Sequence, residues 1–401
     1  MQNKGFIKGA LLGALTVLLI LGCVSCGIDG FGVGSALRRL TEKSDKPVDS
    51  SAETKLELLD ELVDNYYMGE KDGDALREGL YKGYIDGLGD PYSVYYDEEE
   101  TKDMMESFSG EYSGIGAVLT QDRDTGVVTI VQVYPGSPAE EAGIRADDIL
   151  YRVADEEITG LDLTAVVSRI KGDEGTEVGL TLLRGDTAEE VVVTAVRRKI
   201  EVMTVSHEMK EGGIGYIRIT EFDKVTSEQY QTALEDLESQ GLNGLVVDLR
   251  SNPGGNLDVV VEILDLMLPE GTVVSMEEKS GEKTVHTSDE EHQFQKPLAV
   301  LMNGNSASAA EIYAAAIQDY DAGEIVGTQS YGKGVVQQIF DLKDGSSVKL
   351  TIAEYFPPSG RSINGIGITP DVEVEYEPDE ENPEYDNQLE KAIEVVKSQT
   401  S

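Results

Sequence analysis

Two almost entirely apolar segments in the second half of the chain constrain its fold most. Residues 244–250 and 298–302 are near-continuous apolar runs, which are typical of strands buried on both faces of a parallel sheet. Each is followed by a loop and then by a segment with helical spacing, at residues 257–268 and 309–318. This order predicts a largely parallel sheet covered by helices. Because such sheets bind ligands at the carboxyl ends of their strands, the two loops are candidate functional sites.

The loop after the second run carries two serines at the start of a predicted helix. Ser306 and Ser308 lie among small residues, and Lys333 follows in a loop between two glycines. Serine becomes a nucleophile when a neighbouring group takes its proton, and a lysine with a lowered pKa can be that base. None of the three histidines lies in a segment that resembles an active-site loop. The residues favour a Ser308–Lys333 dyad over a triad with histidine, and a surface position for Lys333 is the alternative they leave open.

Lys333 has to be neutral to accept a proton, although the ordinary pKa of lysine is about 10.4. Its flanking glycines and the apolar pair after it predict a buried position, which would lower the pKa to roughly 7–8. Gln337 is expected on the same face of a strand over residues 335–340, where its neutral amide would hold the amine. The N–H of Ala309 and the glycine turn at Gly254 are candidate oxyanion donors, with an ordinary turn as the alternative for Gly254.

Residues 110–198 change to short strands and turns, with glycine-rich segments at residues 114–117, 136–139 and 143–149. This ordered series resembles a PDZ domain, which is a small, half-open β-barrel. The resemblance implies that an extended peptide adds a strand to a sheet edge. It also implies that the terminal carboxylate of the peptide is bound by the backbone N–H groups of Gly114, Ile115, Gly116 and Ala117. An ordinary hairpin is the alternative for the glycines alone.

Three further segments resemble the signature segments of the C-terminal processing peptidases, also called tail-specific proteases. They are DLRSNPGG at residues 248–255, NGNSASAAEI at residues 303–312 and YGKGVVQQ at residues 331–338. With the PDZ-like part ahead of the core, the resemblance covers roughly residues 53–400. It implies Ser308 as nucleophile, Lys333 as general base, Gln337 as the residue that orients the lysine, and the N–H groups of Gly254 and Ala309 as the oxyanion hole. One departure is Lys171, where relatives often have arginine.

The N-terminal residues predict a tie to a membrane. Residues 9–28 carry no charge, and about 20 such residues can cross a bilayer as a helix. A lipoprotein signal at Cys23 and a cleaved secretory signal are the alternatives. We expect a single-pass protein of the cell membrane whose catalytic body is extracytoplasmic, or else a lipoprotein or a secreted protein. The only cysteines, Cys23 and Cys26, lie in or next to this segment, so the rest of the chain needs no disulfide.

Two amphipathic helices are predicted after a linker at residues 29–52. Residues 53–66 and 74–88 repeat apolar side chains at helical spacing. Such helices usually pack against their own protein. Contact between two copies of the chain is the alternative, which keeps a homodimer open.

The formal net charge is -43, and this excess of negative charge repels a phosphate backbone, so nucleic acid is not an expected partner. The sequence holds no metal-ligand or phosphate-loop pattern, so we expect no metal and no cofactor. The expected partners are protein or peptide substrates with free C-termini.

These features predict an α+β multidomain protein with an α/β protease core and a mostly parallel sheet. The expected parts are a membrane anchor or signal segment (1–28), a linker (29–52), a helical segment (53–109), a PDZ domain (110–198), a serine peptidase core (199–380) and a C-terminal helix (381–401). The expected function is that of an extracytoplasmic serine endopeptidase that recognises protein C-termini. A catalytically dead binding scaffold and a latent enzyme opened by peptide binding are the alternatives.

Overall fold

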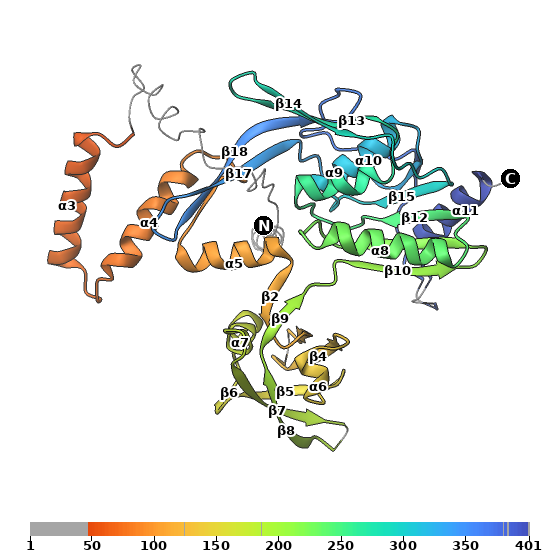
Figure 1. The fold of residues 1–401 in the computed structure, drawn as a ribbon. Helices are drawn as coiled ribbons and strands as arrows, with labels where there is room; N and C mark the ends of the chain where they lie inside the picture. The colour runs from red at the N-terminus through yellow and green to blue at the C-terminus, as the bar shows by residue number, and fades with distance from the viewer. Residues whose placement is uncertain (1–46, 124, 186, 380, 383–384, 400–401) are drawn as a thin grey trace.

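The computed structural model describes residues 47–123, 125–185, 187–379, 381–382 and 385–399. Figure 1 shows a pair of helices, α3 and α4, standing apart at one end, a small domain that includes β2 to β9, and a larger domain from β10 to α11. The predicted membrane segment and lipidation site lie outside the described residues. Within the described ranges, no helix is long and apolar enough to cross a membrane.

The N-terminal helices confirm the two helical segments expected from the sequence. Their first turns are capped by Asp49 and Asp72, whose carboxylates accept backbone N–H groups. No residue of either helix is buried. The elements of this part are α3 (Ser50–Tyr66), α4 (Gly73–Asp86), β1 (Val94–Tyr96) and α5 (Glu98–Ser109).

The small domain is a curved sheet with strand order β3-β4-β5-β7-β8, closed by two short helices around its own apolar core. The strands β2 and β9 pair with each other and connect this domain to the rest of the chain (Figure 1). Its elements are β2 (Glu111–Gly114), β3 (Ala117–Gln121), β4 (Val128–Val133), α6 (Pro138–Glu141), β5 (Ile149–Val153), β6 (Glu156–Glu157), α7 (Leu163–Ile170), β7 (Glu177–Arg184), β8 (Glu189–Val196) and β9 (Arg198–Glu201).

The larger domain is built on a six-stranded sheet with order β10-β11-β12-β15-β16-β19, in which every pair except β10–β11 is parallel. This confirms the mostly parallel sheet. Its elements are β10 (Val205–Lys210), β11 (Ile214–Ile219), α8 (Thr226–Ser239), β12 (Gly244–Asp248), α9 (Leu257–Asp265), β15 (Leu298–Met302), α10 (Ala309–Asp319), β16 (Glu324–Gly327), β19 (Val372–Glu373) and α11 (Asn387–Gln399).

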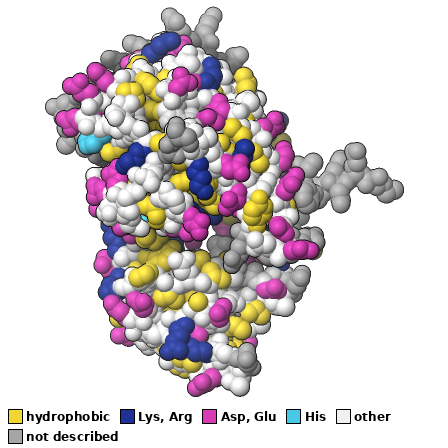
Figure 2. Space-filling model, turned by 90° about the vertical axis from the view of Figure 1, so that its right-hand side faces the viewer, with side chains coloured by type: hydrophobic (Ala, Val, Ile, Leu, Met, Phe, Trp, Pro, Cys, Tyr) yellow, Lys and Arg dark blue, Asp and Glu magenta, His cyan; other side chains and the backbone are white. Residues whose placement is uncertain are grey.

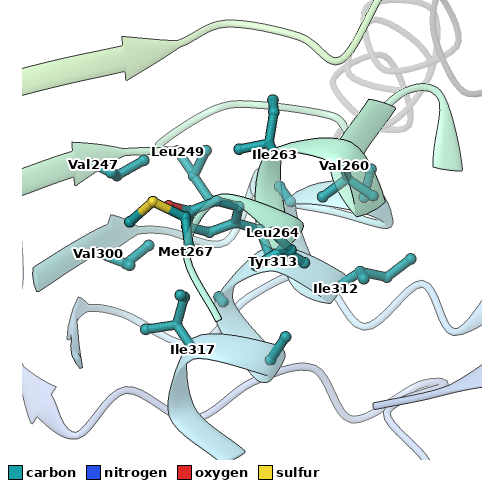
Figure 3. Close-up of a cluster of buried hydrophobic side chains, with 14 of the residues drawn as sticks. Val247, Leu249, Val260, Ile263, Leu264, Met267, Val300, Ile312, Tyr313 and Ile317 are labelled. Atoms are coloured by element: carbon teal, nitrogen blue, oxygen red, sulfur yellow. The ribbon is translucent and has the colours of Figure 1, made fainter. Parts of the chain in front are cut away.

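Both faces of this sheet are buried, which explains the continuous apolar runs of β12 and β15. One face packs on α8, α9 and α10, and Figure 3 shows Val247 and Val300 of the strands against Ile263 and Tyr313 of the helices. The other face packs on α11. Burial of this kind contributes about 25 cal/mol for each Å² of apolar surface removed from water. The core therefore holds the carboxyl ends of β12 and β15 in a fixed relation.

A second sheet connects the N-terminal part to the larger domain. β18 pairs with β1, β13 and β17, so residues 94–96 lie in the same sheet as the strand that follows Lys333. Figure 1 shows β17 and β18 as long strands that extend from the larger domain to α4 and α5. The elements are β13 (Gly271–Glu278), β14 (Lys283–Ser288), β17 (Val335–Asp341) and β18 (Ser347–Phe356).

The helix α8 begins at Thr226, and Val225 at its N-cap position makes no side-chain capping bond. Lys333 lies just before β17, and the pairing of β17 with β18 is irregular at Ile352 of β18, because Gln337 pairs with Thr351. The expected common face of Lys333 and Gln337 stays a prediction.

Acidic side chains are dispersed over the face of the molecule that Figure 2 shows, with hydrophobic side chains between them. This distribution agrees with the net charge of -43.

Candidate active site

Ser308 lies on a strained turn between β15 and α10. Its backbone has φ 54° and ψ -114°, a conformation that costs on the order of 1–3 kcal/mol for a residue with a side chain. Serine on a strained strand-to-helix turn is a recurring arrangement for nucleophiles. Ser308 is 1% exposed, and Ala309 opens the helix directly after it. The first N–H groups of a helix have no partner within the helix, and the N–H of Ala309 is the first of α10.

Glu311 ties the backbone of Ser308 to that of Lys333. The Glu311 carboxylate accepts the N–H of Ser308 at 2.8 Å, the N–H of Lys333 at 2.8 Å, the N–H of Gly332 at 2.7 Å and the Ser330 hydroxyl at 2.5 Å. Burial raises the pKa of Glu311, while these donors act in the opposite direction. Its contacts are with backbone atoms of Lys333, which fits a structural role in the site.

Tyr355 of β18 makes a second connection between the same two residues. Its hydroxyl lies 3.1 Å from the carbonyl oxygen of Ser308 and 2.5 Å from that of Lys333. Two buried side chains therefore connect Ser308 and Lys333. Glu311 binds the backbone N–H groups of both residues, and Tyr355 binds their carbonyl oxygens. The two residues that the sequence proposed as a dyad are brought together by shared partners, although 22 or more residues separate each partner from one of them in the chain.

Lys333 has the electrostatic environment of a base. It is 2% exposed, and this burial, together with the charge of Lys349, lowers its pKa to about 7. Asp90 and Glu311 act in the opposite direction. Removal from water disfavours the ammonium form, and here it outweighs the two carboxylates. A substantial fraction of the Lys333 amine is therefore neutral near pH 7.

Gln337 and Gly254 form hydrogen bonds with residues other than Ser308 and Lys333 in this conformation. The Gln337 amide donates to Thr351 Oγ1 at 3.2 Å, and the N–H of Gly254 donates to Asn252 Oδ1 at 2.7 Å. Among the hydrogen bonds of the described residues, none joins the Lys333 amine to Ser308 or to Gln337. In this conformation Gln337 and Gly254 therefore have hydrogen-bond partners outside the proposed dyad.

Ser306 is distinguished from Ser308 by its contacts. The Ser306 hydroxyl donates to the carbonyl of Leu249 at 2.8 Å and accepts the N–H of Asn303 at 2.9 Å. These bonds connect the two loops at the carboxyl ends of β12 and β15. Because its hydroxyl is fully engaged, Ser306 has a structural role.

The turn of Gly254 is supported by the strand end that precedes α8. Phe222 donates its N–H to the Gly254 carbonyl at 2.9 Å and accepts the N–H of Asn256 at 2.7 Å. A Cβ at Gly255 would lie 2.3 Å from the Phe222 carbonyl oxygen, so only glycine fits there. Burial raises the pKa of the adjacent Glu221 to about 8.

Sequence reasoning missed the residues around the Lys333 amine. The ring centroid of Tyr92 lies 4.6 Å from Lys333 Nζ, and Asp90 and Lys349 contribute charge to its surroundings. The Gly-Asp-Pro sequence at residues 89–91 directly follows the predicted helix at residues 74–88 and is typical of a helix end. Nothing in its local pattern indicates contact with a loop more than two hundred residues later.

The glycine loop of the small domain lies at a sheet edge. Gly114 ends β2 and Ala117 begins β3, the first strand in the sheet order, so Ile115 and Gly116 connect the two strands. Gly116 has φ +77°, and a Cβ there would lie 2.5 Å from Ser137 Cβ, so glycine is required. Lys171 pairs with Glu106 of α5 at 3.1 Å and lies 5.2 Å from the ring centroid of Tyr112.

Family comparisons cover most of this architecture. Peptidase family S41 matches residues 213–374, a PDZ domain matches residues 129–184, and the N-terminal domain of the activating protease CtpB matches residues 35–101.

Individual relatives agree with these matches. The carboxy-terminal processing protease CtpA of Bacillus subtilis (strain 168) is 36% identical over 360 residues, which is 90% of this chain and 76% of that protein. The carboxy-terminal-processing protease of Bartonella bacilliformis is 37% identical over 332 residues, 81% of this chain and 76% of that protein. A solved structure of a photosystem II D1 C-terminal processing protease has 28% identity and a TM-score of 0.47, and the alignment covers 88% of this chain and 98% of that one. The chain belongs to the carboxy-terminal processing proteases, serine peptidases with an S41 peptidase domain and a PDZ domain.

Proposed function

We propose that the protein cleaves peptide bonds through a Ser308–Lys333 acyl-enzyme mechanism, on substrates whose C-termini its PDZ domain binds. The observation that carries this proposal is that the backbones of Ser308 and Lys333 are both hydrogen-bonded to Glu311 and to Tyr355. In addition, the pKa of the Lys333 amine is lowered to about 7. A neutral amine next to a serine on a helix N-terminus is the arrangement that nucleophilic catalysis requires.

In the proposed reaction, Ser308 Oγ attacks the carbonyl carbon of the substrate while Lys333 Nζ takes the hydroxyl proton. Lys333 then gives this proton to the leaving amine, and the C–N bond breaks to leave an ester on Ser308. Water attacks the ester while Lys333 Nζ takes a proton from it. Lys333 then gives this proton to Ser308 Oγ as the ester C–O bond breaks, and the acid product leaves. The N–H groups of Ala309 and Gly254 would stabilise the oxyanion, and Gln337 would orient the lysine.

This mechanism requires a rearrangement from the conformation described. The N–H of Gly254 has to leave Asn252, and the Gln337 amide has to leave Thr351. These contacts favour the latent enzyme over a permanently assembled one. A peptide that binds the PDZ domain better in the assembled conformation would shift the population toward it.

The PDZ part of the proposal rests on the position of β3. An edge strand has unpaired backbone groups that an added peptide strand can bind. β3 is an edge strand that begins at Ala117, directly after Ile115 and Gly116 of the glycine segment. This geometry suits capture of an extended C-terminal segment.

Cleavage of an unfolded protein with an apolar C-terminus tests the proposal. Wild type is expected to cleave it and Ser308→Ala to lose cleavage while keeping the same unfolding transition, because the variant lacks the attacking oxygen. An added apolar C-terminal peptide is expected to raise the wild-type rate. Cleavage by Ser308→Ala would refute the nucleophile. A folded wild type that binds the peptide and never cleaves would favour the binding scaffold.

We also propose that α3 and α4 form a contact between two copies of the chain. Leu59, Leu62 and Tyr66 of α3 are 51%, 45% and 77% exposed, and exposed apolar faces of this kind mark interaction sites. Sedimentation is expected to show a dimer for wild type and a monomer for Leu59→Asp/Leu62→Asp. A wild-type monomer at every concentration would refute this contact.

The extracytoplasmic location is likewise a proposal, and it rests on the uncharged residues 9–28. In intact cells, an added protease is expected to digest the body of the protein. Protection from digestion until the membrane is broken would contradict this location.

A further inference from the structure

The segment from Asp90 to Tyr96 lies against the amine of Lys333, although it is distant in the chain and outside the matched peptidase region. The Tyr92 ring centroid is 4.6 Å from Lys333 Nζ, within the distance at which an aromatic face attracts an ammonium group. Tyr92 is partly exposed, whereas Lys333 is buried. The ring therefore stands at the boundary between the amine and solvent.

Hydrogen bonds fix the backbone of Tyr92 and Ser93 relative to the site. Asp90 accepts the backbone N–H of Tyr92 at 3.1 Å and the Ser93 hydroxyl at 2.6 Å. Ser93 Oγ in turn accepts the N–H of Thr351 in β18 at 3.1 Å. The three residues of β1 then continue the attachment by pairing with β18. Tyr92 is thus held by the same sheet that contains β17, the strand directly after Lys333.

A second lysine–tyrosine pair lies beside the first. Lys349 of β18 donates to Tyr96 Oη at 2.8 Å, and its Nζ lies 5.3 Å from the Tyr96 ring centroid. Burial lowers the pKa of Lys349 to about 8. One short segment therefore covers two buried lysines with two tyrosines, and the charge of one lysine disfavours the charge of the other.

We propose that Tyr92 is a positioning residue for the reaction: its ring covers the Lys333 amine, excludes water from it and holds Nζ in place as the amine loses and regains its proton. This inference rests on the proposed role of Lys333 as the base. The ring has two opposing effects on the amine. Its face attracts the ammonium form, and its bulk removes water, which favours the neutral form.

The direction in which the pKa of Lys333 is shifted shows whether attraction by the ring or exclusion of water is the larger effect. The charged and titratable groups around the amine are Lys349, Asp90 and Glu311, with Tyr92 itself and Tyr331 beside it. The pKa of Lys333 is lowered by burial first and by Lys349 second, against both carboxylates. Exclusion of water therefore dominates, and opening the site is expected to raise the pKa.

The test compares three substitutions of Tyr92 in the full chain. Tyr92→Phe keeps the ring and is expected to match wild type in kcat and in the pH dependence of kcat/KM. Tyr92→Ser admits water and is expected to move the acid limb of kcat/KM upward by about one pH unit or more, with kcat reduced about tenfold and KM little changed. Tyr92→Leu keeps water out without a ring face, so kcat is expected to fall while the acid limb does not rise. Tyr385→Ser, at an exposed tyrosine just before α11, is the matched control.

A second measurement does not depend on activity. In Ser308→Ala protein, NMR titration of labelled lysine side chains reports the Lys333 pKa, with the signal assigned by its loss in Lys333→Met. Tyr92→Ser is expected to raise this pKa and Tyr92→Phe to leave it unchanged. Wild-type behaviour of Tyr92→Ser in both measurements, or equal changes in Tyr92→Phe and Tyr92→Ser, would overturn the inference. Retained cleavage by Lys333→Met would instead refute the base, and the two failures are thereby distinguished.

Discussion

Lys333→Met is expected to lower kcat/KM by about 10³-fold or more, because it removes the proposed base and leaves the rest of the site intact. Methionine has a similar length and suits a buried apolar position. Wild-type kcat/KM is expected to rise with pH through about 7 as the Lys333 amine loses its proton. The variant should show no such limb at any pH. Steady-state cleavage of a peptide between about pH 5 and pH 10 checks both statements.

The same substitution is expected to change stability in a direction set by the pKa. Lys333 has a pKa of about 7 in the folded protein against 10.5 as the ordinary value, so the unfolded chain binds the proton more tightly. As pH falls from 10.5 toward about 7, proton binding to the unfolded chain lowers the unfolding free energy of wild type. Below about pH 7 both states bind the proton, and this reduction stays constant. Lys333→Met removes this cost, on the order of a few kcal/mol at most. Its gain in unfolding free energy should be largest below about pH 7 and fade toward high pH.

Two controls separate the base from general damage. Lys343→Met, at an exposed lysine in the turn between β17 and β18, is expected to leave both rate and stability unchanged. Lys333→Arg keeps a positive charge that does not dissociate in proteins, so it should be inactive as well. A wild-type acid limb in Lys333→Met would show that another group accepts the proton.

The sequence predicted the parts of the site that local patterns determine. Apolar runs predicted β12 and β15, and the small residues after β15 predicted the turn on which Ser308 lies. Burial of Lys333 followed from the glycines around it. These features depend on neighbours within a few residues, so a single chain displays them.

The rest depends on contacts between distant segments or on the conformational state of the site. Tyr92 reaches Lys333 because β1 pairs with β18, and no pattern near residue 92 specifies that pairing. The expected common face of Gln337 and Lys333 stays a prediction, because Lys333 lies before β17 and the irregularity in the pairing falls at Ile352 of β18. The N–H of Gly254 binds the Asn252 side chain in this conformation. Binding a substrate instead would require another conformational state, which sequence patterns do not specify.

Glu311→Ala is expected to cause a large loss of both stability and activity. The carboxylate accepts three backbone N–H groups and one hydroxyl, all around a fully buried position. Each buried donor left without a partner costs about 1–3 kcal/mol, and water entering the cavity would offset part of the sum. We expect a net loss on the order of 3–5 kcal/mol in unfolding free energy. Chemical denaturation checks this value.

The activity of the Glu311 variants shows whether this carboxylate positions the dyad or only stabilises the domain. Glu311→Gln keeps the shape of the side chain, but its NH₂ group is a donor that would face other donors. This variant should also have a lower unfolding free energy and cleave slowly. Tyr355→Phe leaves Glu311 intact and removes only the hydroxyl between the carbonyls of Ser308 and Lys333. It should lower kcat about tenfold, with a loss of only about 1–2 kcal/mol in stability.

Glu262→Ala, at an exposed glutamate of α9, is the matched control and should resemble wild type. If Tyr355→Phe and Glu311→Gln retain full kcat below their unfolding transitions, the shared contacts of Ser308 and Lys333 serve stability alone. A fall in kcat at temperatures where each variant is fully folded would instead show that these contacts set the distance between nucleophile and base. Misplacement of catalytic groups by about 1 Å is enough to cost about 10²-fold in rate, so rate is the more sensitive measure of this geometry.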